Sequence, residues 1–216
     1  MKSAMNVITY REIKKDDYET IQSIINESFG LYRYIDNERV LKNLLKLYLQ
    51  SCLAEKTFSC VAEKGGNIVG VILGKSKNDY KILTHLKNIL GVVFYNSITT
   101  LKAIQYKSNI SDYRNMHHIY HKLLAGREKE FDGVLTLFAV TEDCRGLGVG
   151  KKLLSNLCDY LRNHNTKHIY LYTDSTCNYG FYDNQGFERL GEKSLETTCE
   201  NKLITMNVFL YGYKVK

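Results

Sequence analysis

The chain has 216 residues, with 30 basic and 23 acidic side chains and a formal net charge of +7. This length suits one domain, or one domain with a large insertion, and it is long enough to bury a substantial core. The charge is mild and scattered, without the dense basic stripe of a nucleic-acid-binding protein, so we predict no nucleic-acid partner. No apolar run is as long as a membrane span, and residues 1–6 lack the apolar segment of a signal peptide. We therefore predict no membrane partner.

The first third of the sequence predicts a mixture of strands and helices. Residues 7–13 alternate as a strand does, and Asp16 is expected to cap a helix whose apolar side chains recur at helical spacing up to Phe29. A second helix is predicted from about Asn37 to Glu55. Residues 57–63 and 67–74 predict two strands, and the Lys64-Gly65-Gly66-Asn67 segment between them predicts a tight hairpin.

Residues 78–130 change character, because apolar side chains recur there at helical spacing in three separate stretches. We predict two or three helices inserted between strands. A buried strand is expected at 134–140, an amphipathic helix after residue 148 and another strand at 168–173, an order that implies a parallel pair with a right-handed crossover. The remaining elements expected are a short helix at 178–185 and strands at 187–195 and 202–211.

Glycines alternate in the hexapeptide Arg145-Gly146-Leu147-Gly148-Val149-Gly150, between the buried strand and the amphipathic helix. Such a turn presents backbone N–H groups to an anion, the glycines leave room for a phosphate, and Arg145 adds positive charge. The spacing differs from the G-x-G-x-x-G dinucleotide fingerprint, and Lys152 stands where a nucleoside triphosphate loop has Ser or Thr. The alternative is a glycine-rich turn that merely joins a strand to a helix.

Two segments resemble the GNAT superfamily of N-acetyltransferases. Residues 145–150 match its R/Q-x-x-G-x-G/A motif, and Tyr182-Asp183-Asn184-Gln185-Gly186-Phe187 resembles its Y-x-x-x-G-F segment. The resemblance is specific over about residues 132–192, rests only on the order of elements over 6–75, and says nothing of 78–130. It implies an α/β (α+β) fold with a mixed, mostly antiparallel sheet of about six or seven strands flanked by helices. Residues 1–216 would form a single domain with a helical insertion at about 78–130.

The resemblance also implies a co-substrate, acetyl-coenzyme A, lying where the strands at 134–140 and 168–173 splay apart, and no metal. Backbone N–H groups at the glycine-rich loop and helix start would hold the pyrophosphate. Unpaired backbone groups of the first strand would hold the pantetheine arm as an added strand does. Many family members place a cofactor-contacting asparagine where this chain has Ser175, and Asn178 is the nearest replacement. The cofactor-binding residues implied are Phe138, Ala139, Val140, Arg145, Gly146, Leu147, Gly148, Val149, Gly150, Lys151 and Asn178.

Acetyl transfer to an amine requires loss of the ammonium proton, a donor for the tetrahedral oxyanion and help for the departing thiolate. Tyr182 matches the family tyrosine and is the predicted acid, with a core tyrosine as the alternative. The oxyanion donor is expected to be a backbone N–H near Ala139 or Val140. No base is assigned, because Glu142, Asp143 and Asp174 equally suit helix caps or surface charges, and a water chain performs the same task.

Two further groups invite a chemical interpretation. His117 and His121 share a helix face and could hold a metal ion, yet no Cys or Glu nearby completes a set, which favours a polar face or a substrate-pocket wall. Cys144 beside Arg145 looks like an activated nucleophile. The family transfers acetyl directly, so Cys144 is expected only to pack within the loop.

The function predicted is an N-acetyltransferase that moves acetyl from acetyl-coenzyme A to a primary amine of a small molecule or peptide. A non-catalytic acyl-coenzyme A sensor is the main alternative, and a nucleotide-binding regulatory domain is a third. Polyamines, aminoglycosides, amino acids and protein N-termini all remain open as acceptors, and the insertion would cover the acceptor site or form a homodimer contact. Six scattered cysteines without a CxxC pair favour a cytoplasmic protein.

Overall fold

The computed structural model describes residues 7–200 and 202–216, and its strands form one seven-stranded sheet in the order β1-β2-β3-β4-β5-β7-β6. The strands are β1 (Ile8–Arg11), β2 (Phe58–Lys64), β3 (Asn67–Ser76), β4 (Gly133–Val140), β5 (His168–Asp174), β6 (Glu188–Cys199) and β7 (Lys202–Lys214). The α-helices are α1 (Tyr18–Phe29), α2 (Glu38–Glu55), α3 (Ile82–Gln105), α4 (Ser111–Leu124), α5 (Val149–Asn163) and α6 (Gly180–Asn184), joined by short 3-10 turns that include η3 (Leu31–Arg33) and η4 (Glu142–Cys144).

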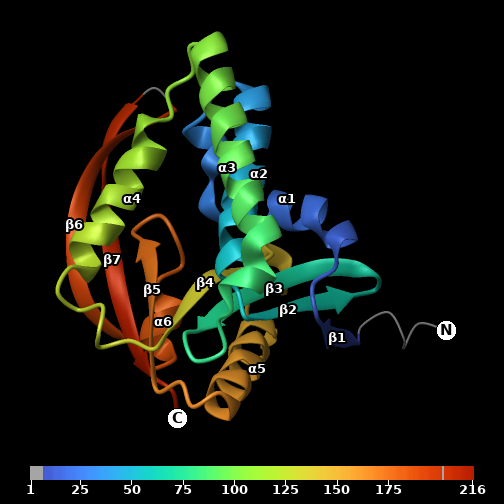
Figure 1. Cartoon of the computed structure of the whole chain (residues 1–216). Helices are drawn as coiled ribbons and strands as arrows, with labels where there is room; N and C mark the ends of the chain where they lie inside the picture. The colour runs from blue at the N-terminus through green and yellow to red at the C-terminus, as the bar shows by residue number, and fades with distance from the viewer. Residues whose placement is uncertain (1–6, 201) are drawn as a thin grey trace.

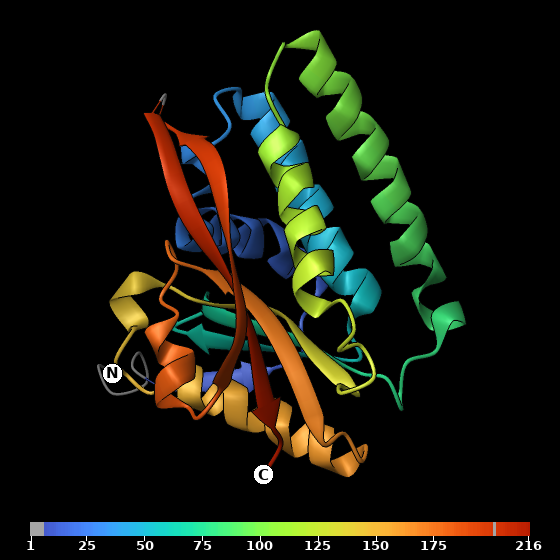
Figure 2. The same cartoon turned by 90° about the vertical axis from the view of Figure 1, so that its left-hand side faces the viewer.

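All neighbouring strands pair antiparallel except β4 and β5, which pair parallel, so the predicted mixed, mostly antiparallel sheet is confirmed. Helix α5 covers one face of the sheet, whereas α1 and α2 cover the other (Figures 1 and 2). Alternation along β3 divides the core accordingly, because Ile72 packs with the α5 side and its neighbours Val71 and Leu73 pack with α1 and α2.

The segment between β3 and β4 forms two helices, α3 and α4, where the periodicity predicted two or three. The first two apolar stretches belong to one continuous helix of 24 residues, α3, which packs along α2. Their contact is close at Gly91, where a side chain's Cβ would lie 2.8 Å from Nε2 of Gln50. Helix α4 lies on the other side, against β6 and β7 (Figure 2). The insertion therefore reaches from α2 to the β6–β7 hairpin.

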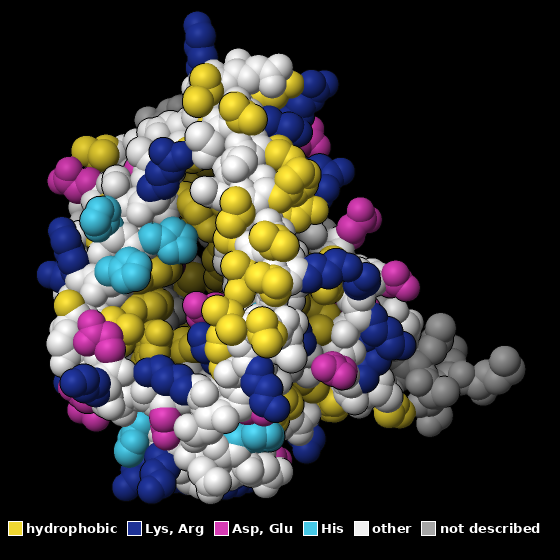
Figure 3. All heavy atoms as spheres, viewed as in Figure 1, with side chains coloured by type: hydrophobic (Ala, Val, Ile, Leu, Met, Phe, Trp, Pro, Cys, Tyr) yellow, Lys and Arg dark blue, Asp and Glu magenta, His cyan; other side chains and the backbone are white. Residues whose placement is uncertain are grey.

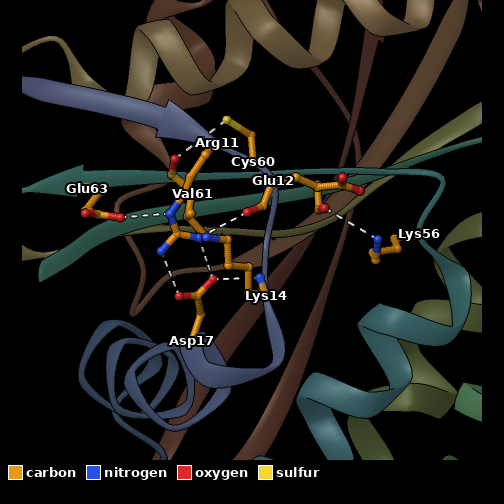
Figure 4. A network of polar contacts seen from close by, with 9 residues as sticks. Arg11, Glu12, Lys14, Asp17, Lys56, Cys60, Val61 and Glu63 are labelled. Atoms are coloured by element: carbon orange, nitrogen blue, oxygen red, sulfur yellow. Dashed lines mark hydrogen bonds and ion pairs between the residues drawn. The ribbon is translucent and has the colours of Figure 1, made fainter. Parts of the chain in front are cut away.

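The start of α1 differs from the prediction. The carboxylate that organises this turn belongs to Asp17, whereas Asp16, the predicted cap, is exposed. Asp17 accepts hydrogen bonds from Nη1 and Nη2 of Arg11, each at 2.8 Å, and from the backbone N–H of Lys14 at 2.7 Å (Figure 4). Arg11 also donates to Glu63, so a single guanidinium ties β1, β2 and α1 together. The hydrogen bonds from Arg11 hold the pKa of Asp17 below its usual value.

Most other boundaries match the sequence prediction. Asn37 caps α2 by accepting from the N–H groups of Arg39 and Val40. Gly65 and Gly66 form the hairpin turn with φ values of 57° and 84°, as the type of turn requires. Strands β6 and β7 are longer than predicted. Their pairing runs on to Cys199↔Lys202, and Thr197 of this extension donates to Asp112 of α4 at 2.6 Å. The long hairpin thus reaches the insertion.

None of the helices in the described part of the chain is long and apolar enough to cross a membrane.

Candidate active site

Strands β4 and β5 separate soon after they meet. They pair only at Gly133↔Ile169 and Val134↔Tyr170, whereas β4 continues along β3 as far as Val140 and β5 continues along β7 as far as Asp174. Within the described residues, the edge of β4 from 135 to 140 therefore has no strand beside it. Unpaired backbone amides and carbonyls along such an edge can hydrogen bond an extended ligand.

The glycine-rich loop follows β4 and leads into α5. Gly146 and Gly148 have φ values of 77° and 81°, in the left-handed region that residues with side chains rarely adopt. The backbone conformation of the loop therefore favours glycine at both positions. The first hydrogen bond within α5 runs from the N–H of Lys152 to the carbonyl of Gly148. The N–H groups that precede Lys152 have no carbonyl acceptor within the helix, and no side chain in the described residues caps them. The first turn also contains no acidic residue. This helix start suits an anion.

Gly150 has a different role. A Cβ there would lie 3.1 Å from Phe138 and 3.3 Å from Phe181, so glycine allows α5 to pack closely against β4 and α6. Phe138 and Phe181 are themselves in contact, with ring centroids 5.1 Å apart. The loop, the open strand edge and α6 are thereby fixed to one another.

A cavity of about 430 Å³ begins at this loop and passes between β4 and β5. Its loop side is lined by most of the residues expected to bind the cofactor: Phe138, Ala139, Val140, Arg145, Gly146, Gly148, Gly150, Lys151 and Asn178. Leu147 and Val149 are not in its wall. Leu147 is 58% exposed, and Val149 is buried in the core beneath the loop.

Tyr182 lies in the wall of the same cavity and is 8% exposed. Its ring packs edge-on against Phe187 and Phe138, with centroids 5.4 and 6.2 Å away. Burial raises the pKa of its hydroxyl well above the usual value, and no hydrogen bond contributes to that shift within the described chain. Tyr182 is therefore both a core residue and a neutral phenol at a cavity, so the two readings of this residue are compatible.

The structure separates the two candidates for the asparagine position. Asn178 lies in the cavity wall. Ser175 is outside the cavity, and its hydroxyl accepts the backbone N–H of Asn207 at 3.1 Å, which joins the end of β5 to β7.

The far half of the cavity was not anticipated from the sequence. Five tyrosines from four parts of the chain line this half, which we call the tyrosine chamber: Tyr34, Tyr48, Tyr113, Tyr120 and Tyr172. Helix α4 contributes two of them, seven residues apart and so on one face, a spacing that could have identified this wall. The rings of Tyr120 and Tyr172 stack at 4.2 Å with an interplanar angle of 11°.

Two carboxylates and a histidine also line the chamber. Asp112 accepts from Thr197 and Thr198 of β6, and Asp174 accepts from Oγ1 and N–H of Thr176 at 2.5 and 2.8 Å. His117 lies near Tyr113 and Tyr120, and desolvation and the neighbouring His121 lower its pKa. Of the predicted acidic candidates, Asp174 alone reaches the cavity wall, whereas Glu142 and Asp143 are exposed in the η4 turn.

Cys144 is buried beneath the loop with 1% exposure, although part of it also reaches the cavity wall. His117 lies in that wall, whereas His121 does not. Across residues 7–200 and 202–216, no group of three or more His, Cys, Asp or Glu side chains is placed to hold a metal ion.

The sequence model of the Acetyltransferase (GNAT) family matches residues 18–187. Among solved structures, an N-acetyltransferase from Staphylococcus aureus Mu50 is 12% identical, with a TM-score of 0.56 and coverage of 98% of this chain and 100% of that one. The Salmonella typhimurium acetyltransferase yncA with its cofactor acetyl-CoA is 16% identical, with a TM-score of 0.55 and coverage of 98% and 95%. An agmatine N-acetyltransferase variant in its apo form is 11% identical, with a TM-score of 0.60 and coverage of 96% and 99%. A search of curated protein sequences finds no match.

The TM-scores show that these proteins share the fold of this chain, and the family match covers most of the chain. The match also spans the insertion at 78–130, about which the motifs at 145–150 and 182–187 carry no information. The resemblance first indicated by residues 145–150 and 182–187 is therefore confirmed: the chain belongs to the GNAT family of acetyltransferases.

Proposed function

We propose that the protein is an acetyl-coenzyme A-dependent N-acetyltransferase that transfers acetyl directly to a primary amine of a small molecule or peptide. The observation that carries the proposal is one continuous cavity. It joins an uncapped helix start and an open strand edge, which suit coenzyme A, to a separate chamber that can hold an acceptor beside Tyr182.

Coenzyme A has two parts that match the loop side of the cavity. Its pyrophosphate would accept hydrogen bonds from the N–H groups of residues 146–151, with Arg145 and Lys151 adding positive charge. Its pantetheine amides would pair with the free edge of β4 at Phe138, Ala139 and Val140. Asn178, in the same wall, would hydrogen bond the arm near the thioester.

In the reaction, the lone pair of a neutral amine attacks the thioester carbonyl and a C–N bond forms. The nitrogen then loses its extra proton to water, and the C–S bond breaks with the electron pair leaving on sulfur. A backbone N–H near Ala139 or Val140 would stabilise the oxyanion. The thiolate leaves from a site lined by Tyr182. Because burial raises the pKa of Tyr182, its phenol stays protonated and donates a hydrogen bond to the sulfur. The same shift makes complete transfer of the proton to a thiolate unfavourable.

Two variants test the proposal together. Tyr182→Phe should lower kcat for amine-dependent thiol release by about 10- to 100-fold, at the lower end of general-acid effects, with little change in the affinity for acetyl-coenzyme A. Tyr10→Phe is the control, because Tyr10 lies in edge strand β1, on the side of the sheet remote from the cavity. An unchanged kcat in Tyr182→Phe would remove Tyr182 from the mechanism. Binding of acetyl-coenzyme A without turnover of any amine would favour the sensor alternative.

We further infer that the whole chain acts as one acetyltransferase domain in which the insertion supplies part of the acceptor wall. We also propose a cytoplasmic location. All six cysteines are free thiols, and four of them are buried, as expected for a protein of a reducing compartment.

A further inference from the structure

The tyrosine chamber has a composition that selects among amines. Besides its five tyrosines, its wall is made mostly of large aliphatic and aromatic side chains, among them Phe29, Leu44, Met116 and Met206. Figure 3 shows hydrophobic side chains within the hollow beside α4. Flat rings and branched aliphatic groups of this kind pack best against an apolar or aromatic body.

The distribution of charged side chains in the cavity wall limits which amines can bind in the chamber. Among the described lining residues, the only Lys and Arg side chains are Arg145 and Lys151, and both belong to the loop side. An acceptor that carried a carboxylate would leave it buried without a cationic partner, a costly arrangement. Amino acids therefore fit poorly.

The two carboxylates of the chamber are already engaged by protein donors. Asp112 holds the extended β6 strand through Thr197, and Asp174 holds the turn after β5 through Thr176. Because these donors are neutral, both carboxylates keep a negative charge that can attract an incoming ammonium. A polyamine would bring further ammonium groups among apolar side chains, where only these two carboxylates are available to balance them.

The tyrosine hydroxyls supply the polar component. Burial raises the pKa values of Tyr48, Tyr113 and Tyr120, and no side-chain hydrogen bond contributes to these shifts within the described chain. The buried hydroxyl of Tyr34 lies near Thr176 and makes no hydrogen bond of good geometry among the described residues. These neutral groups can accept or donate a hydrogen bond to a single polar substituent on a ring.

We propose that the acceptor is an arylalkylamine, a primary amine on a short alkyl chain that ends in an aromatic ring. The inference rests on the proposed acetyltransferase function and names its substrate class. Helix α4 then sets the specificity, since Tyr113, Met116 and Tyr120 form one wall of the chamber.

Matched amines test the proposal with the intact protein. Phenethylamine and phenylalanine differ by one carboxylate, and phenethylamine and butylamine differ in the ring. We expect kcat/KM for phenethylamine to exceed that for phenylalanine by about 100-fold or more, and to exceed those for butylamine and spermidine by about 10-fold or more. Tyr113→Ala should raise KM for phenethylamine about 10-fold. Tyr32→Ala is the control, because Tyr32 is 56% exposed and lies outside the cavity.

Binding of acetyl-coenzyme A, measured by calorimetry on the same preparation, distinguishes a wrong acceptor from a wrong acetyltransferase function. If acetyl-coenzyme A binds and spermidine or an amino acid is the preferred acceptor, the inference is wrong while the acetyltransferase function stands. If Tyr113→Ala folds and keeps the wild-type KM for phenethylamine, the chamber is not the acceptor site. If no amine is acetylated, both proposals fail.

An independent feature lies on the outer face of α3. Eight apolar side chains, between 50% and 82% exposed, form a stripe along this helix, and Figure 3 shows them as a column: Ile82, Leu83, Leu86, Leu90, Val93, Phe94, Leu101 and Ile104. At about 100 Å² for each fully exposed side chain, they present on the order of 500 Å² of apolar surface. Apolar patches of this size are typical of interaction sites, and the centre of a standard interface is of similar extent.

The stripe is complementary to itself. If two copies of α3 run antiparallel about a two-fold axis between Val93 and Phe94, Leu83 faces Ile104 and Leu86 faces Leu101 of the other copy. In the same register Lys87, at the side of the stripe, lies opposite Thr100 and not opposite a second lysine. The geometry points to a second copy of this chain as the occupant of the stripe.

Light scattering at micromolar concentration tests this pairing. We expect a dimer for the wild type and a monomer for Leu90→Glu, which places a charge at the centre of the stripe. Thr84→Glu, on the same helix but off the stripe, should remain a dimer. A monomeric wild type overturns the pairing. Cosedimentation of that monomer with phosphatidylserine vesicles would instead identify the stripe as a membrane-binding face.

Discussion

Gly148 offers the sharpest perturbation of the proposed cofactor site. Its φ of 81° belongs to the left-handed region, and an added Cβ meets no atom within 4 Å. Gly148→Ala therefore adds backbone strain without a steric clash in the free protein. That strain is about 1–2 kcal/mol for a residue with a side chain.

The consequence for binding follows from where Gly148 lies. It caps α5 and lines the cavity, so an alanine either shifts the N–H groups of the helix start or places a methyl group in the cavity wall. Each route weakens a bound pyrophosphate. If the full strain appears in binding, the Kd of coenzyme A rises by about 5- to 30-fold.

A glycine in the β2–β3 hairpin provides a matched control. Gly66 has a φ of 84°, and a Cβ there also meets nothing within 4 Å, yet it lies in the β2–β3 turn, outside the cavity wall. Gly66→Ala should lower the Tm at least as much as Gly148→Ala, because strain that the free loop relieves by shifting is lost from folding and appears in binding instead. Gly66→Ala should leave coenzyme A binding unchanged. Titration calorimetry with coenzyme A measures both variants. If Gly148→Ala binds within two-fold of the wild type, the reasoning on the glycine-rich loop is refuted.

Other predictions concern stability. Asp17→Asn should cost about 1–3 kcal/mol at neutral pH, because the carboxylate loses charge-assisted hydrogen bonds from Arg11, and urea unfolding at several pH values measures the loss. The pKa of Asp17 is lower in the folded than in the unfolded protein, so its stabilisation is fully present above the unfolded pKa of about 4. This stabilisation disappears as the pH falls through the lower folded pKa. The difference in free energy of unfolding between wild type and variant should therefore vanish only under acidic conditions. A gap that is constant down to the most acidic measurable pH would contradict the ion pair's role. Leu157→Ala should cost about 2–5 kcal/mol in the same assay, because Leu157 is fully buried between α5 and the sheet. Gly74→Ala should cost about 1–3 kcal/mol, since its Cβ would lie 2.5 Å from Leu157. The double variant should then lose less than the sum of the two, and strict additivity would argue against this contact.

The donor side of the site could be predicted from sequence because its requirements are local. The left-handed turns at Gly146 and Gly148, the helix start after them and the tyrosine of α6 lie within one stretch whose spacing is readable. The hairpin at Gly65-Gly66 and the cap at Asn37 were likewise local. The Asp16 cap was wrong because the choice between adjacent carboxylates depends on Arg11, which approaches from a strand.

The acceptor side could not be assembled in this way. Tyr48, Tyr113 and Tyr172 come from separate elements, and only the packing of α4 against the extended β6–β7 hairpin brings them together. Nothing local distinguishes them from the other tyrosines in the chain. The end of β6 was also underestimated, because its polar residues 196–199 carry little apolar alternation. Strand β7 continues three residues beyond the predicted end, to Lys214, where it pairs with β5.

Transfer itself is the most direct test of the central claim. Purified protein, acetyl-coenzyme A and phenethylamine can be incubated together, with free thiol measured by absorbance and the amine product by mass spectrometry. We predict N-acetylphenethylamine in equal amount to the coenzyme A released, and a much slower release when the amine is omitted. Coenzyme A that binds but yields no acetylated product with this or any other amine would contradict the account.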